Sequence, residues 1–207
     1  MPLRIPFLKL KPFQQDVFNS ITVVSGLPRS GTSLMMKMLE AGGMELLIDN
    51  IRKPDKDNPK GYYEFERVKQ LDKGDIEWLA DAQGKVVKII ATLLPYLPDI
   101  FEYRILFMRR KMTEILASQR KMLLHRGTDP DNITDEQMSQ VFEKHIRKVE
   151  EWLSARSNIL RLDVDYNKLL VNPFPVIDQV NQFLSKELDF EQMLEIIDPN
   201  LYRQRSQ

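Results

Sequence analysis

Residues 21–33 read Ile21-Thr22-Val23-Val24-Ser25-Gly26-Leu27-Pro28-Arg29-Ser30-Gly31-Thr32-Ser33. The opening run is β-branched and apolar, which predicts a short buried strand that stops at Gly26. Gly26 and Gly31 have the spacing of a phosphate-binding loop, in which successive backbone N–H groups point inward. The apolar residues that follow indicate a buried helix ending at Gly42-Gly43, whose N-terminus adds a partial positive charge. We therefore expect the loop from Gly26 to Ser33 to bind the phosphate of a nucleotide; the alternative is a plain glycine-containing turn.

The rest of the chain alternates between strand-like and helix-like patterns. Further buried strands are expected at 85–90, 103–108 and 158–164, and helices at 64–80, 113–125, 134 to about 156, and 173 to about 184. Thr134 and Gln137 have the spacing of a capping box, and Pro173 suits the first turn of a helix. This alternation predicts crossover connections and a central, mainly parallel sheet. Together with the glycine loop, it leads us to expect an α/β fold of three layers, α/β/α, like that of the P-loop NTPases. We expect one domain over 1–207, with an N-terminal extension at 1–19 and an α/β core with a C-terminal tail at 20–207.

Composition narrows the range of functions. The chain has 30 Lys and Arg and 30 Asp and Glu, so its formal net charge is zero, which argues against general nucleic-acid binding. It has no cysteine, which excludes disulfides, thiolate metal sites and a cysteine nucleophile. No apolar run is long enough to cross a bilayer, and residues 1–12 lack the pattern of a signal peptide. We therefore expect a cytoplasmic protein without an integral membrane segment.

The loop departs from that of an ordinary ATPase or GTPase. Thr32 stands where the usual lysine follows the second glycine, and the loop instead carries a cation within it, Arg29. The acidic strand-end residue expected for magnesium is lacking, except for Asp163 and Asp165 on the last strand. The loop therefore disfavours magnesium-dependent hydrolysis of ATP or GTP, and no metal is expected.

Two segments carry a resemblance to a known family. Pro28-Arg29-Ser30-Gly31-Thr32-Ser33 resembles the 5′-phosphosulfate loop of sulfotransferases that use 3′-phosphoadenosine 5′-phosphosulfate (PAPS). The family also binds the 3′-phosphate with an Arg at a strand end and a Ser eight residues later, a spacing that Arg110 and Ser118 share. Glu114 falls where the family often has Asp. The usual Asn-Pro or Asp-Pro after the Arg is replaced by Lys111-Met112, which leaves open whether Arg109 or Arg110 reads the 3′-phosphate.

Weaker resemblances extend over most of the chain. Residues 58–64 are similar to a substrate-side segment of bacterial sulfotransferases, 165–173 to a Tyr-Glu-x-Leu…Asn-Pro segment, and 201–205 to a basic C-terminal piece that closes over the nucleotide. The resemblance implies PAPS as cofactor, adenosine 3′,5′-bisphosphate (PAP) as product, and no metal requirement. The cofactor-binding residues it implies are Pro28, Arg29, Ser30, Gly31, Thr32, Ser33, Arg109, Arg110, Ser118 and Arg203.

The charge pattern around the second motif agrees with binding of a polyanion. Residues 104–126 hold seven Lys or Arg and one Glu. Such a cluster suits a nucleotide with several anionic groups. Arg110, at a strand end, fits that function, whereas Lys111, Arg120 and Lys121 fit an ordinary solvated helix face.

Sulfonate transfer needs a base for the proton of the acceptor. His125 lies near a helix end and His145 on an apolar helix stripe, so neither is a good candidate. Glu64, beside two aromatic residues, is the predicted base, with Glu66 as the alternative and a solvated helical Glu as the plain interpretation. Lys88 lies in a buried strand, where it either contacts the transferring sulfonate or reaches solvent at the strand end. With Arg29 on the leaving phosphate, the predicted catalytic residues are Glu64, Lys88 and Arg29.

The resemblance thus implies in-line transfer of a sulfonate from PAPS to a hydroxyl or amine acceptor, either a small molecule or a carbohydrate. Tyr62, Tyr63 and Trp78 either line the acceptor pocket or belong to the core. The alternatives are a nucleotide or small-molecule kinase of the same fold, and a nucleotide-binding module without turnover. No nucleic-acid partner is expected, and the oligomeric state is open.

Overall fold

The computed structural model describes residues 19–49, 51–53, 55, 61–129 and 133–197. Four parallel strands form its sheet: β1 (Ile21–Gly26), β2 (Val86–Lys88), β3 (Tyr103–Arg109) and β4 (Ile159–Asp165). Their order is β2-β1-β3-β4, so the strand that precedes the glycine loop is central. The predicted parallel sheet is confirmed.

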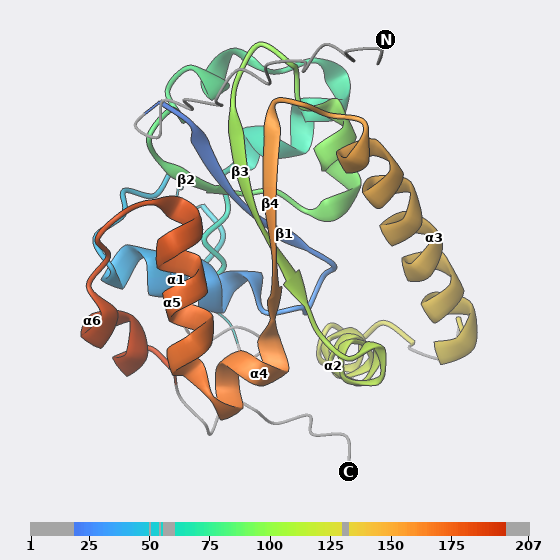
Figure 1. The fold of residues 1–207 in the computed structure, drawn as a ribbon. Coiled ribbons are helices and arrows are strands. Elements are labelled where there is room, and N and C mark those ends of the chain that lie inside the picture. Colours follow the sequence, from blue (N-terminus) through green and yellow to red (C-terminus); the bar gives the residue numbers. More distant parts are fainter. Residues whose placement is uncertain (1–18, 50, 54, 56–60, 130–132, 198–207) are drawn as a thin grey trace, which may run out of the picture.

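Helices cover both faces of the sheet. On one face lie α1 (Thr32–Ala41), α4 (Tyr166–Val171), α5 (Pro173–Leu184) and α6 (Phe190–Glu195), packed on strand residues such as Val24, Leu106 and Val164. On the other lie α3 (Asp135–Ser154) and three 3₁₀ helices: η1 (Glu66–Lys73), η2 (Glu77–Leu79) and η3 (Ala91–Tyr96). Figure 1 shows α3 and α5 on opposite sides of the strands. The three-layer α/β/α prediction is confirmed.

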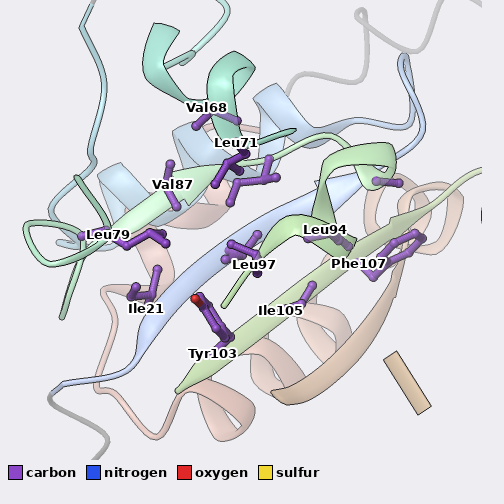
Figure 2. Close-up of a cluster of buried hydrophobic side chains, with 14 of the residues drawn as sticks. Ile21, Val68, Leu71, Leu79, Val87, Leu94, Leu97, Tyr103, Ile105 and Phe107 are labelled. Atoms are coloured by element: carbon purple, nitrogen blue, oxygen red, sulfur yellow. The ribbon is translucent and has the colours of Figure 1, made fainter. Parts of the chain in front are cut away.

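Alternation along the strands explains the two cores. In β3, Ile105 and Phe107 belong to the core under the 3₁₀ helices, while Leu106 and Met108 belong to the core under α1 and α5. Figure 2 shows the first core, where Ile105 and Phe107 gather with Leu94 and Leu97. Because both faces of the sheet are covered, its strands read as continuous apolar runs.

The prediction of one continuous helix over 64–80 is wrong. The segment instead forms η1 and η2, separated by Gly74, whose φ of 86° lies in the left-handed region. A left-handed residue ends a helical turn, and glycine adopts that conformation without steric cost. The side chain of Trp78 is buried in the core after this break, and its Nε1 donates to the carbonyl of Asp75.

Two short helices were not predicted, α4 and α6, each six residues long. Both begin after an aspartate whose side chain accepts a hydrogen bond from the backbone, Asp165 from Lys168 and Asp189 from Gln192. The helix α3 does begin with the predicted capping box of Thr134 and Gln137. The carboxyl ends of β3 and β4 lead directly to α2 (Met112–His125) and α4, which flank the glycine loop (Figure 1).

Candidate functional site

The loop between β1 and α1 is built around two glycines that no other residue could replace without a clash. Gly26 has a φ of 147° and Gly31 a φ of 101°. A Cβ at position 26 would lie 2.5 Å from Ser30 Oγ and 2.8 Å from the carbonyl oxygen of Met108. A Cβ at position 31 would lie 2.3 Å from Tyr166 Cδ2. The backbone therefore curls tightly against β3 and α4.

Arg29 holds an unusual backbone conformation at the tip of this loop. Its φ of 70° is left-handed, which costs a non-glycine residue roughly 1–2 kcal/mol. Two contacts with distant residues stabilise it. Its Nε donates to Ser118 Oγ at 2.9 Å, and its carbonyl oxygen accepts from Arg110 Nη1 at 2.9 Å. The structure thus brings together Arg29, Arg110 and Ser118, three of the predicted cofactor-binding residues.

Arg109, the last residue of β3, and Arg110, which follows it, contact different parts of the protein. The Arg110 side chain is 7% exposed, pairs with Glu114 at 3.0 Å and lies over the ring of Tyr166, with 4.6 Å from Cζ to the ring centre. Arg109 instead pairs with Glu150 of α3 and, at 3.3 Å, with Asp163 of β4. Arg110 is therefore the arginine that contacts the glycine loop.

Asp163 and Asp165, the two strand-end acids, are bound within the protein. Asp163 accepts hydrogen bonds from Arg161 and Arg109. Burial raises the pKa of Asp163, but the hydrogen bond from Arg161 and the charges of both arginines outweigh it, so the pKa lies below its usual value. Asp165 caps α4. Within the described residues no group of three or more His, Cys, Asp or Glu is placed to hold a metal ion.

Lys88 ends β2 and is buried rather than extended into solvent. Its side chain is 8% exposed, and its Nζ donates to the carbonyl of Tyr62 and, at 3.4 Å, to Ser33 Oγ in the first turn of α1. Glu64 Oε1 lies 3.8 Å from the same Nζ. Burial lowers the pKa of Lys88 from 10.5 to about 8, although the negative charge of Glu64 opposes the shift.

The two candidate bases differ in what they face. Glu64 is 20% exposed, lies near Lys88, and pairs with Arg52 at 2.8 Å. Glu66 is 46% exposed and pairs with Lys69 at 2.8 Å on the surface. Glu64 is therefore the carboxylate on the side of the Lys88 ammonium.

Arg52 is a residue of this cluster that the sequence did not suggest. Its guanidinium lies over the ring of Tyr62, with 3.3 Å from Cζ to the ring centre, in addition to its ion pair with Glu64. The Tyr62 hydroxyl donates to Asp55 at 2.7 Å. Burial, followed by the hydrogen bond to Asp55, raises the pKa of Tyr62. A lone arginine in a polar loop carries no pattern that would have revealed these contacts.

The remaining predicted residues lie in several different surroundings. Ser30 is buried, and its Oγ has no hydrogen-bond partner in the part of the chain that the structure describes. Pro28 is exposed at the loop surface, and Thr32 and Ser33 form the first turn of α1. Trp78 belongs to the core, so it does not line a pocket there. Two parts of the predicted segments lie outside the described residues: 58–60 of the segment 58–64, and the whole of 201–205, which includes Arg203.

A cavity of about 360 Å³ opens beside the loop. It is lined by Leu27, by the end of β3 with Arg109 and Arg110, by α2 and by α3. Its volume lies at the small end of the range for small-molecule sites. In the described ranges of the chain, none of the helices has both the length and the apolar character that crossing a membrane requires.

The fold was compared with those of known proteins. The chain matches no family model and no curated protein. Among solved structures it is similar to a sulfotransferase domain from the curacin biosynthetic pathway, with a TM-score of 0.50 and 17% identity over 87% of this chain and 78% of that one. It is also similar to the sulfotransferase STF9 from Mycobacterium avium, with a TM-score of 0.54 and 9% identity over 91% of this chain and 69% of that one. The chain therefore has a sulfotransferase-like fold.

Proposed function

We propose that this protein is a PAPS-dependent sulfotransferase that moves a sulfonate to a hydroxyl or amine acceptor. One observation supports the proposal above the others. Lys88 Nζ lies 3.4 Å from Ser33 Oγ, at the end of the glycine loop, and 3.8 Å from the carboxylate of Glu64. The anion-binding loop and the predicted base are thus joined by a single buried ammonium group.

The glycine loop fits the 5′ end of such a nucleotide. A Cβ at Gly26 or Gly31 would meet Ser30, Met108 or Tyr166, so the glycines allow the tight curl of the loop. A curled glycine backbone at a helix N-terminus can point its N–H groups at an anion. The hydroxyl of Ser30 is buried in the same curl with no partner among the described residues, and it suits a phosphate oxygen. We propose that the loop N–H groups, the Ser30 hydroxyl and the Arg29 guanidinium bind the 5′-phosphate, with Pro28, Thr32 and Ser33 completing the loop.

The 3′-phosphate is assigned to Arg110 and Ser118. Both contact Arg29, so the two ends of the nucleotide would be bound by one connected group of residues. Arg109 is the less suitable candidate because it pairs with Glu150 and Asp163. Arg203 stays in the proposed set on the sequence resemblance alone.

PAPS, when bound, supplies the sulfonate and a phosphate leaving group. Lys88, with a pKa of about 8, is mostly protonated at neutral pH and donates hydrogen bonds to oxygens that gain negative charge. Arg29 and the loop N–H groups stabilise charge on the 5′-phosphate. Glu64, on the other side of Lys88, accepts the acceptor's proton. In this proposal Glu64 takes the proton of a hydroxyl or amine on either a small-molecule or a carbohydrate acceptor.

The direct test is turnover of PAPS with a panel of hydroxyl and amine acceptors, including simple sugars, measured as PAP release. Release stimulated by at least one acceptor and unaffected by EDTA supports the proposal. Phosphate transfer from ATP with magnesium, in the absence of PAPS turnover, would favour a kinase. Tight PAP binding without turnover for any acceptor would favour a binding module.

A further inference from the structure

The most deeply buried carboxylate in the described chain lies behind the proposed nucleotide site. The side chain of Glu114, in the first turn of α2, is 1% exposed. A buried carboxylate is costly unless ion pairs and hydrogen bonds satisfy its oxygens. Arg110 Nε donates to Oε2 at 3.0 Å, and Asn167 Nδ2 donates to Oε1 at 2.9 Å and to Oε2 at 3.0 Å.

Two neighbours of Asn167, Glu114 and Lys111, need opposite hydrogen-bonding groups from its side chain. Its nitrogen faces the Glu114 carboxylate, which only accepts hydrogen bonds, and its oxygen accepts from the Lys111 backbone N–H at 3.3 Å. An amide satisfies both, because it carries a donor and an acceptor. An aspartate at 167 would place a second negative charge against a buried one.

These contacts continue to the glycine loop. Asn167, at the start of α4, holds Glu114; Glu114 holds the Nε edge of Arg110; and Arg110 Nη1 binds the carbonyl of Arg29. The second terminal nitrogen of Arg110, Nη2, has no hydrogen-bond partner within the described ranges. Two of the three guanidinium nitrogens of Arg110, Nε and Nη1, therefore donate to protein oxygens, and Nη2 is left to donate to a ligand.

We infer that Asn167 and Glu114 are positioning residues that orient Arg110 toward the 3′-phosphate, and so set the preference for 3′-phosphorylated nucleotides. The inference rests on the proposed function. Neither residue contacts the nucleotide in this account; each acts through the guanidinium plane. Arginine suits this arrangement because its N–H donors lie in one rigid plane. Contacts that hold Nε and Nη1 therefore also fix the direction in which Nη2 donates.

The experiment compares dissociation constants for PAP and for adenosine 5′-monophosphate by calorimetry. The readout is the ratio of the two constants, which cancels any general loss of folded protein. In Asn167→Asp the preference for PAP should fall about ten- to hundredfold, the range expected for a lost charge-assisted hydrogen bond. The double variant Glu114→Gln with Asn167→Asp restores one amide and one carboxylate in reversed positions, and should regain most of the preference.

Gln140→Glu is the matched control, because it makes the same change of amide to carboxylate on an exposed position of α3. It should leave the ratio unchanged. Should Asn167→Asp not fold, Asn167→Ala gives the same comparison without added charge. A wild-type chain that does not distinguish PAP from adenosine 5′-monophosphate overturns the proposed function itself. A wild-type preference that survives in both Asn167 variants, or a double variant no better than Asn167→Asp, overturns only the positioning role.

Discussion

Arg110 Nη1 donates to the carbonyl oxygen of Arg29 at 2.9 Å, although 81 residues separate the two along the chain. The side chain of Arg29 in turn reaches Ser118 on α2. The two sequence motifs are therefore one structural unit, because each contributes a contact that holds the other. A change at either should alter binding at both ends of a nucleotide.

The first prediction concerns the guanidinium of Arg29. In Arg29→Gly the left-handed backbone is relieved but the cation is lost, so the protein should fold normally and bind PAP at least about tenfold more weakly. Arg29→Ala should bind as weakly and also be less stable, because alanine keeps the strained φ. Calorimetry and thermal unfolding measure the two effects separately. Unchanged PAP affinity in both variants would contradict the loop assignment.

The second prediction separates the two arginines at the end of β3. Arg110→Gln should erase most of the preference for PAP over adenosine 5′-monophosphate, and Arg109→Gln should keep it. Both glutamine and alanine remove the ion pair with Glu114, and breaking a buried pair costs about 3–5 kcal/mol. Glutamine is used because its neutral amide can still donate a hydrogen bond to that carboxylate, which alanine cannot. If Arg110→Gln discriminates as well as the wild type and Arg109→Gln does not, the 3′-phosphate role belongs to Arg109.

The third prediction concerns the proposed base. Glu64→Gln should lower kcat by roughly a hundred- to ten-thousandfold while changing PAP affinity little, because the acceptor proton then has no base. Glu66→Gln is the matched control, two residues away on the surface, and should retain full activity. Steady-state turnover with an acceptor found in the panel measures both. Full turnover in Glu64→Gln would remove Glu64 from this role.

The fourth prediction follows from the lowered pKa of Lys88. In the proposed mechanism the ammonium form of Lys88 is the active one, so turnover should fall as pH rises through about 8, by about tenfold per pH unit. Lys88→Arg should abolish this alkaline limb because arginine does not titrate there. A pH–rate profile of both proteins tests this, and an alkaline limb that survives in Lys88→Arg would assign it to another group.

The same residue links activity to stability. Burial disfavours the charged lysine in the folded state, so the unfolded chain binds more protons between pH 8 and 10.5, and stability should rise with pH across that window. The shift corresponds to roughly 3 kcal/mol. Lys88→Met should therefore unfold at higher temperature at pH 7 while losing turnover. Lys73→Met, at an exposed position of η1, should change neither. A less stable Lys88→Met protein would contradict the account of its burial.

Local patterns predicted the fold because they act over a few residues. The run before Gly26, the spacing to Gly31 and the capping box at Thr134 each specify an element through neighbouring atoms. The type of helix predicted for 64–80 was wrong because a buried apolar pattern does not distinguish an α-helix from 3₁₀ turns broken at Gly74. The helices α4 and α6 are too short to show a clear apolar period in the sequence, and tertiary packing stabilises them.

The site was less predictable because its contacts span long separations. The pairing of Glu114 with Asn167 joins residues 53 apart, and Arg52 reaches Glu64 from within a polar loop. The period of two in β3 places Arg109 on the face of Phe107 and Arg110 on that of Met108. Which of those faces meets the glycine loop depends on the packing of α2 and α4, which sequence alone did not supply.

In the proposed function, backbone N–H groups of the loop around Ser30 bind the 5′-phosphate of a 3′-phosphorylated nucleotide, and magnesium takes no part. The decisive measurement is thermal unfolding with PAP, adenosine 5′-monophosphate or ATP at equal concentration, each once with EDTA and once with magnesium and no EDTA. We expect a clear rise in Tm with PAP, a smaller one with adenosine 5′-monophosphate, and no added effect of magnesium. Stabilisation by ATP only when magnesium is present, with none by PAP, would contradict it.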